Sequence, residues 1–103
     1  MHTPEILIRE KGSSAVRHIT LEQGVNSFGR SADNQIQLIS PLVSRVHGTI
    51  RRWSSIVSLQ DNRSTNGVRV NGQLVRHATL FTGDVVEVGP FVIQVMHGSV
   101  DPD

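Results

Sequence analysis

Three short polar clusters contain the side chains of this chain that could do chemistry. Each cluster lies beside a run typical of a β-strand: Phe28-Gly29-Arg30-Ser31, Ser44-Arg45-Val46-His47 and Asn62-Arg63-Ser64-Thr65-Asn66-Gly67. Together they offer guanidinium, hydroxyl and amide groups, from Arg30, Arg45, Ser44, Thr65 and Asn66. If the three loops meet at one end of a β-sandwich, these groups would converge on a single surface.

These groups match the chemistry of a phosphate carried by an extended peptide. A phosphoryl group has three strong acceptor oxygens, and arginine can donate two parallel N–H bonds to such oxygens. A carboxamide has two donors and an acceptor, so it can pair with the backbone of a peptide. Each cluster taken alone is also ordinary turn chemistry. The order and spacing of the three clusters between strands favour a binding site.

Alternating apolar and polar residues predict that the chain is built almost entirely from strands. The period-two pattern recurs at 5–9, 16–21, 35–38, 55–59, 68–70, 86–88 and 91–95. Asn71-Gly72 lies between two short runs and predicts a type I′ hairpin, because both central residues of that turn need a positive φ. No window of a dozen residues has a helical period. Many short strands separated by turns favour an all-β sandwich or barrel.

The length and composition are those of one globular domain. The chain has 103 residues, 37% hydrophobic and 18% charged, so it can bury a core without a disulfide or a metal. We expect the packed domain to span residues 5–97, with flexible termini at 1–4 and 98–103. Cysteine, a long apolar run and a basic-then-apolar start are all absent. We therefore expect an intracellular protein that does not associate with a membrane.

Charge and residue spacing argue against nucleic-acid binding and against catalysis. The formal net charge is only +1, there is a single tryptophan, Trp53, and tyrosine is absent. A nucleic-acid site normally needs a basic stretch and aromatic residues on which bases stack. The histidines and acids are scattered without metal-ligand spacing, and no nucleophile has a base beside it. We expect no enzyme, no metal site, no cofactor and no nucleic-acid partner.

In their order and spacing, the motifs of this sequence resemble those of the forkhead-associated (FHA) domain. The matching residues are Phe28-Gly29-Arg30, Asp33-Asn34-Gln35-Ile36-Gln37-Leu38, Ser44-Arg45-Val46-His47, Asp61, Ser64-Thr65-Asn66-Gly67, Val70-Asn71-Gly72, Leu80, Gly83-Asp84 and Val88-Gly89. The match covers roughly residues 28–95, and the strands predicted before it fit the start of the domain. The resemblance implies an all-β, FHA-type sandwich of two sheets and about eleven strands, whose loops at one end bind phosphothreonine peptides.

The resemblance also implies a role for each polar residue of the clusters. Arg30 and Ser44 would be the main phosphate contacts. Arg45 and Thr65 fall at positions that add phosphate contacts in some members of the family. Asn66 falls where an asparagine of the family holds the backbone of the ligand beside the phosphothreonine.

Other residues of the clusters would shape the site rather than contact the phosphate. Gly29, His47 and Gly67 would shape the loops, so we expect His47 to be a brace and not a ligand contact. Arg63 and Ser64 could add to a basic rim or reach the ligand residues that flank the phosphothreonine. The expected function is phosphothreonine-dependent recognition of a protein or peptide, as an adaptor in Ser/Thr kinase signalling. The alternative is a β-sandwich that binds another protein without need of phosphate.

Overall fold

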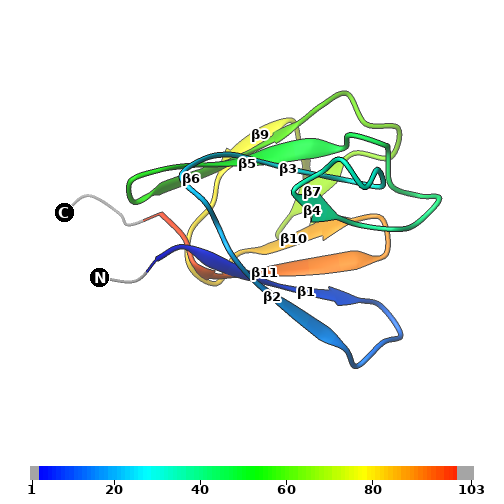
Figure 1. Cartoon of the computed structure of the whole chain (residues 1–103), viewed down its shortest axis with the longest axis horizontal. Coiled ribbons are helices and arrows are strands. Elements are labelled where there is room, and N and C mark those ends of the chain that lie inside the picture. The colour runs from blue at the N-terminus through cyan, green and yellow to red at the C-terminus, as the bar shows by residue number, and fades with distance from the viewer. Residues whose placement is uncertain (1–2, 100–103) are drawn as a thin grey trace.

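The computed structural model describes residues 3–99, which form eleven strands in two sheets (Figure 1). One sheet has the order β2-β1-β11-β10-β7-β8. Its strands are β1 (Glu5–Glu10), β2 (Val16–Thr20), β7 (Val68–Val70), β8 (Gln73–Val75), β10 (Val85–Val88) and β11 (Phe91–His97). The other sheet has the order β4-β3-β5-β6-β9. Its strands are β3 (Gly24–Gly29), β4 (Ile36–Gln37), β5 (Gly48–Trp53), β6 (Ile56–Asp61) and β9 (His77–Thr79). This architecture confirms the predicted all-β sandwich.

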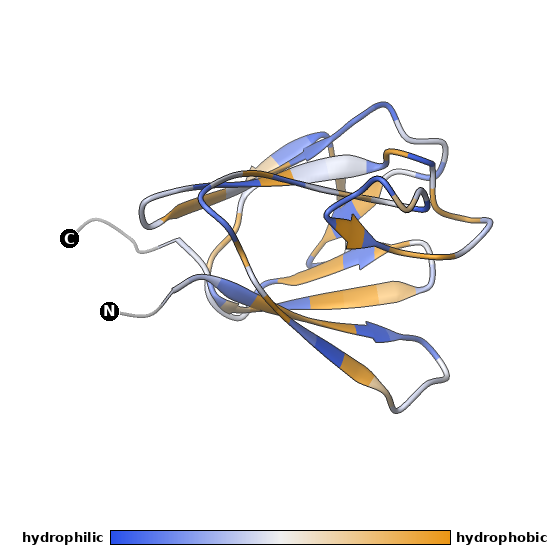
Figure 2. Cartoon of the chain, viewed as in Figure 1, coloured by the Kyte–Doolittle hydropathy of each residue, from blue (hydrophilic) through white to orange (hydrophobic). Residues whose placement is uncertain are grey.

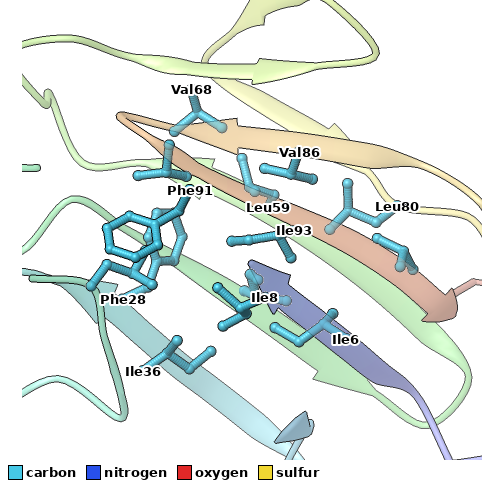
Figure 3. Close-up of a cluster of buried hydrophobic side chains, with 14 of the residues drawn as sticks. Ile6, Ile8, Phe28, Ile36, Leu59, Val68, Leu80, Val86, Phe91 and Ile93 are labelled. Carbon is cyan, nitrogen blue, oxygen red and sulfur yellow. The ribbon is translucent and has the colours of Figure 1, made fainter. Parts of the chain in front are cut away.

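The core lies between the two sheets because the longer strands of both, such as β1, β5, β6 and β11, alternate buried residues with more exposed ones. On β1, Ile6 and Ile8 are buried, whereas Leu7 between them is only half-buried. Figure 2 shows hydrophobic residues on strands of both sheets, and on β11 the buried ones are Phe91, Ile93 and Val95. Figure 3 shows how the inward side chains from both sheets meet in one cluster, which includes Phe28, Leu59, Ile93 and their neighbours.

The predicted hairpin at Asn71-Gly72 is confirmed. Asn71 has a φ of 52° and Gly72 a φ of 84°, as a type I′ turn requires, and the turn joins β7 to β8 with Val70 opposite Gln73. The side chain of Asn71 also contacts the next turn, because its Nδ2 donates to Oδ1 of Asp84 at 3.1 Å. This contact connects the hairpin to the start of β10.

The packed chain extends beyond the predicted boundary at residue 97. Ser99 is buried, its amide donates to the carbonyl of Leu80 (2.7 Å), and its hydroxyl accepts from the amide of Val57 (2.7 Å). At the other end, Pro4 is buried and its carbonyl accepts the amide of Leu21 (2.9 Å). The remainder of the segments predicted to be flexible, apart from Thr3 and Gly98, lies outside the described residues. Between residues 3 and 99, no helix is long and apolar enough to cross a membrane.

The loops that follow β3, β4 and β6 gather at one end of the sandwich, on the right of Figure 1. Antiparallel pairing brings the end of β3, the start of β5 and the end of β6 to this same edge, with Gly48 opposite both Phe28 and Asp61. Strand β4 pairs with β3 in parallel, so the chain must return through a loop before β5 begins. The three predicted polar clusters therefore lie on neighbouring loops.

Candidate functional site

The loop after β3 carries Arg30, and it packs closely against the next loop because position 29 is a glycine. A Cβ on Gly29 would collide with the backbone carbonyl of Arg45 and would lie 2.9 Å from Nδ2 of Asn34. Without that atom, the amide of Arg30 donates to the carbonyl of Ser44 at 2.9 Å. The side chain of Arg30 is exposed, so its guanidinium is open to a ligand.

A turn that begins at Ser40 positions Ser44. The hydroxyl of Ser40 accepts the amide of Leu42 (3.1 Å), and its carbonyl accepts the amide of Val43 (3.0 Å). Val43 then anchors the loop in the core, where its side chain is buried. Ser44 comes directly after this buried residue and is itself half-buried, so the turn and the anchor together fix its position.

His47 joins this loop to the loop after β6. The imidazole is completely buried. Its Nδ1 accepts the amide N–H of Ser44 at 3.0 Å, so its Nε2 carries the proton and donates to the carbonyl of Gly67 at 2.8 Å. The ring also stacks on Phe28, with 5.9 Å between the ring centroids and 27° between the planes. Backbone groups thus occupy both ring nitrogens and leave neither for a ligand.

Hydrogen bonds between near neighbours hold the loop after β6, and one further hydrogen bond joins this loop to Ser44. Oδ1 of Asp61 accepts the amide of Ser64 at 3.3 Å, and the hydroxyl of Ser64 accepts the amide of Gly67 at 2.9 Å. Gly67 has a φ of 79°, which a residue with a Cβ rarely adopts. The loop is thereby turned so that the amide of Thr65 donates to Oγ of Ser44 at 3.1 Å.

A small cavity of about 120 Å³ lies where the three loops meet, and we call it the phosphate cavity after the group that the sequence analysis predicts there. Its lining residues are Arg30, Pro41, Leu42, Val43, Ser44, Thr65 and Asn66. Because Ser44 Oγ already accepts from Thr65, its own O–H is left to donate. Asn66 Nδ2 donates to the carbonyl of Leu42 at 2.9 Å, which leaves one N–H and the amide oxygen for a ligand.

Four of the five predicted contact residues line this cavity, and Arg45 does not. Arg45 is exposed, and its backbone carbonyl accepts from Nδ2 of Asn34 at 2.6 Å. A phosphate contact by its guanidinium stays a prediction. Both predicted rim residues, Arg63 and Ser64, line a neighbouring groove described below, and the hydroxyl of Ser64 also accepts the amide of Gly67.

Pro41, Leu42 and Val43 line the cavity but were not among the predicted site residues. Leu42 exposes 53% of its surface, although the residue after it is buried. The sequence contains one signal for this segment, an apolar pair directly after a proline and directly before Ser44. These residues add apolar side chains to the lining of the cavity.

No acid within residues 3–99 pairs with the positive charge of the cavity. In this part of the chain, Lys11 pairs with Glu87 at 3.0 Å, and the imidazoles of His18 and His97 lie 3.0 and 3.8 Å from Glu5, where they pair only when protonated. None of them involves an arginine, so the guanidinium of Arg30 has no carboxylate partner there. Among these same residues, no group of three or more histidine, aspartate or glutamate side chains could hold a metal ion.

Sequence and fold together define the class of this protein, and the chain belongs to the FHA domain family. The family model of the FHA domain matches residues 26–89. This span contains all three loops and every predicted site residue.

One relative is the glycogen accumulation regulator GarA of Mycobacterium tuberculosis, which is 33% identical over 93 residues, 90% of this chain and 57% of GarA. The chain therefore spans little more than half the length of this relative. The FHA domain of FhaA, also from M. tuberculosis, was solved in complex with the intracellular domain of Rv3910. It is 36% identical with a TM-score of 0.79, over 87% of this chain and 98% of that one. A structure from an analysis of phosphothreonine-dependent FHA domain interactions is 33% identical with a TM-score of 0.79, over 96% of this chain and 99% of that one.

Proposed function

We propose that this chain is a phosphothreonine-dependent recognition module that acts as an adaptor in Ser/Thr kinase signalling. The observation that carries the proposal is the phosphate cavity, where Arg30, Ser44 and Asn66 from three separate loops meet. Membership of the FHA family supports it, as do similar structures studied for phosphothreonine-dependent interactions and solved with a protein partner. The module acts by binding and not by catalysis, and its ligand is an intracellular phosphoprotein.

The phosphate supplies most of the binding free energy in this proposal. The guanidinium of Arg30 and the hydroxyls of Ser44 and Thr65 donate to its oxygens. A hydrogen bond to a charged group contributes about 1.5–3 kcal/mol. Three or four such bonds therefore supply most of the roughly 8 kcal/mol of a micromolar complex. A ligand without phosphate forms none of them, so phosphorylation acts as the switch.

Asn66 sets the register of the ligand, and the apolar side chains of the cavity select threonine. The free N–H and oxygen of the Asn66 amide pair with the backbone beside the phosphothreonine. The threonine methyl packs against the wall formed by Leu42 and Val43. Burial of one methyl contributes about 1 kcal/mol, which corresponds to roughly a fivefold preference over phosphoserine.

The proposal is tested by titrating phosphothreonine, phosphoserine and unmodified versions of one peptide into the wild type and Arg30→Ala by calorimetry. We expect Arg30→Ala to weaken phosphothreonine binding by at least about tenfold, since a charged hydrogen bond contributes about 1.5–3 kcal/mol. Arg9→Ala, an exposed arginine on β1 of the sheet, is the matched control. Unchanged affinity in a folded Arg30→Ala variant would refute the role of Arg30. Equal binding of modified and unmodified peptide would favour a phosphate-independent module.

A further inference from the structure

A second and larger groove, which we call the flank groove, lies directly beside the phosphate cavity. It has a volume of about 550 Å³, which is in the range of protein pockets that hold ligands. Thr65 and Asn66 line both the groove and the cavity. A peptide that places its phosphate in the cavity and its backbone on Asn66 therefore has a neighbouring residue at the groove, because adjacent residues of an extended chain are about 3.3 Å apart.

Two arginines make the flank groove positive. Arg63 and Arg76 both line it and both are exposed. Within residues 3–99, neither guanidinium forms an ion pair, and neither makes a side-chain hydrogen bond. Asp61 is the acid of the groove, and one of its carboxylate oxygens already accepts the amide of Ser64. The groove thus presents two unpaired cations against one carboxylate.

The backbone at Arg63 gives a separate reason to look for a ligand. Its φ is 49°, in the left-handed region that glycine and asparagine adopt with less strain. The turn itself does not need a guanidinium at this position. Strain of this kind on an exposed, charged residue beside a binding cavity is a basis for a functional hypothesis.

The floor of the flank groove is partly apolar. Leu74 on β8 exposes 62% of its surface. Its side chain lies close to the loop after β6, since a Cβ on Gly67 would lie 2.6 Å from Leu74 Cδ1. An acidic side chain could therefore rest its methylene groups on Leu74 while its carboxylate faces the two arginines.

We propose that the flank groove binds an acidic side chain from the ligand segment that flanks the phosphothreonine. The inference rests on the proposed function and adds a sequence preference to it. Arg63 and Arg76 are the residues that select the acid. They act on the flank of the ligand and not on the phosphate.

The test is a set of alanine-based phosphothreonine peptides with one glutamate, or one glutamine, at each of the four positions on either side. Their affinities are measured by fluorescence anisotropy for the wild type, Arg63→Gln, Arg76→Gln and the double variant. We expect glutamate to bind more tightly than glutamine at one position, by about two- to fivefold for each arginine, as exposed ion pairs do. The double variant should lose this preference.

Arg9→Gln is the matched control for the loss of one positive charge. Arg9 lies on β1, which is four strands away from β8 in the same sheet, or about 19 Å at the usual strand spacing. This is beyond the screening length of about 8 Å at physiological salt, so the glutamate preference should persist. Arg63→Gly keeps the left-handed backbone without a side chain, and it should reduce the preference as Arg63→Gln does.

Two results would overturn the inference. One is a set of peptides in which no position prefers glutamate. The other is an equal loss of affinity for glutamate and glutamine peptides in the arginine variants. The plain alanine phosphopeptide and its dephosphorylated form separate this failure from that of the proposed function. If only the phosphorylated form binds, the proposed function is supported whether or not the groove selects an acid. Equal binding of both forms would overturn the proposed function itself.

Discussion

Replacing His47 with alanine should destabilise the fold and loosen the phosphate cavity together. The change leaves the part-buried amide of Ser44 and carbonyl of Gly67 without their partners, and each costs about 1–3 kcal/mol where water does not replace the imidazole. It also removes a buried ring that stacks on Phe28, and such truncations in a core cost roughly 2–5 kcal/mol. Even the lower limits amount to about 4 kcal/mol, a large part of the 5–15 kcal/mol that stabilises a typical domain.

The measurement is thermal unfolding followed by circular dichroism. A loss of 1 kcal/mol lowers the melting temperature of a domain of this size by about 4–8 °C, so His47→Ala should melt at least about 15 °C below the wild type. If His47→Ala does not fold, His47→Gln provides the comparison, because its amide can replace part of the lost contacts. A His47→Ala protein that melts within a few degrees of the wild type would refute the bracing role. If it also failed to bind the phosphopeptide, His47 would be a ligand contact instead.

Two further substitutions separate ligand contacts from loop architecture. Asn66→Ala removes the amide proposed to pair with the ligand backbone, at about 1 kcal/mol for each hydrogen bond, together with the hydrogen bond to the carbonyl of Leu42. It should weaken phosphopeptide binding about five- to thirtyfold by anisotropy while binding stays phosphate-dependent, and equal binding of unmodified peptide would contradict this role. Gly29→Ala should lower both stability and affinity, because its Cβ would meet the carbonyl of Arg45 and overpacking costs about 1–3 kcal/mol. Gly12→Ala is the control: a Cβ there meets nothing within 4 Å, but the φ of 86° strains any residue with a side chain, so it should lower stability and leave affinity unchanged. A Gly29→Ala variant with wild-type melting and binding would be inconsistent with the close approach of the two loops.

The fold was predictable where a strand has one buried face or a turn has a strict backbone requirement. Asn71-Gly72 is the clearest case, because few residue pairs adopt two positive φ angles. Strand β9 was not predicted, since its residues are half-buried or exposed and it lies at the edge of its sheet, where it pairs only with β6. The run at 35–38 was predicted as a strand but forms only the two-residue β4. A periodic pattern also carries no information on partners, so the parallel pairing of β3 with β4 was not accessible from it.

The candidate site was only partly predictable, because the direction of a side chain within a loop is not visible in the sequence. Ser44 and Ser64 look alike as hydroxyl residues in polar clusters. Each hydroxyl accepts a backbone amide in the structure, but Ser44 lines the phosphate cavity, whereas Ser64 lines the groove beside it. Arg76 was not predicted either, since it lies between β8 and β9, far along the chain from the loop whose groove it shares.

The phosphate cavity is ordered in its backbone but unbalanced in its charge. Ser44 accepts from the amides of both Arg30 and Thr65, through its carbonyl and its hydroxyl respectively, so a single residue ties the three loops together. The ligand therefore does not have to order these loops, and little of the binding free energy is lost in doing so. Among residues 3–99, no carboxylate pairs with Arg30. In the proposed function a phosphate supplies that charge, and the chemical state of the ligand, rather than a movement of the domain, then determines whether binding occurs.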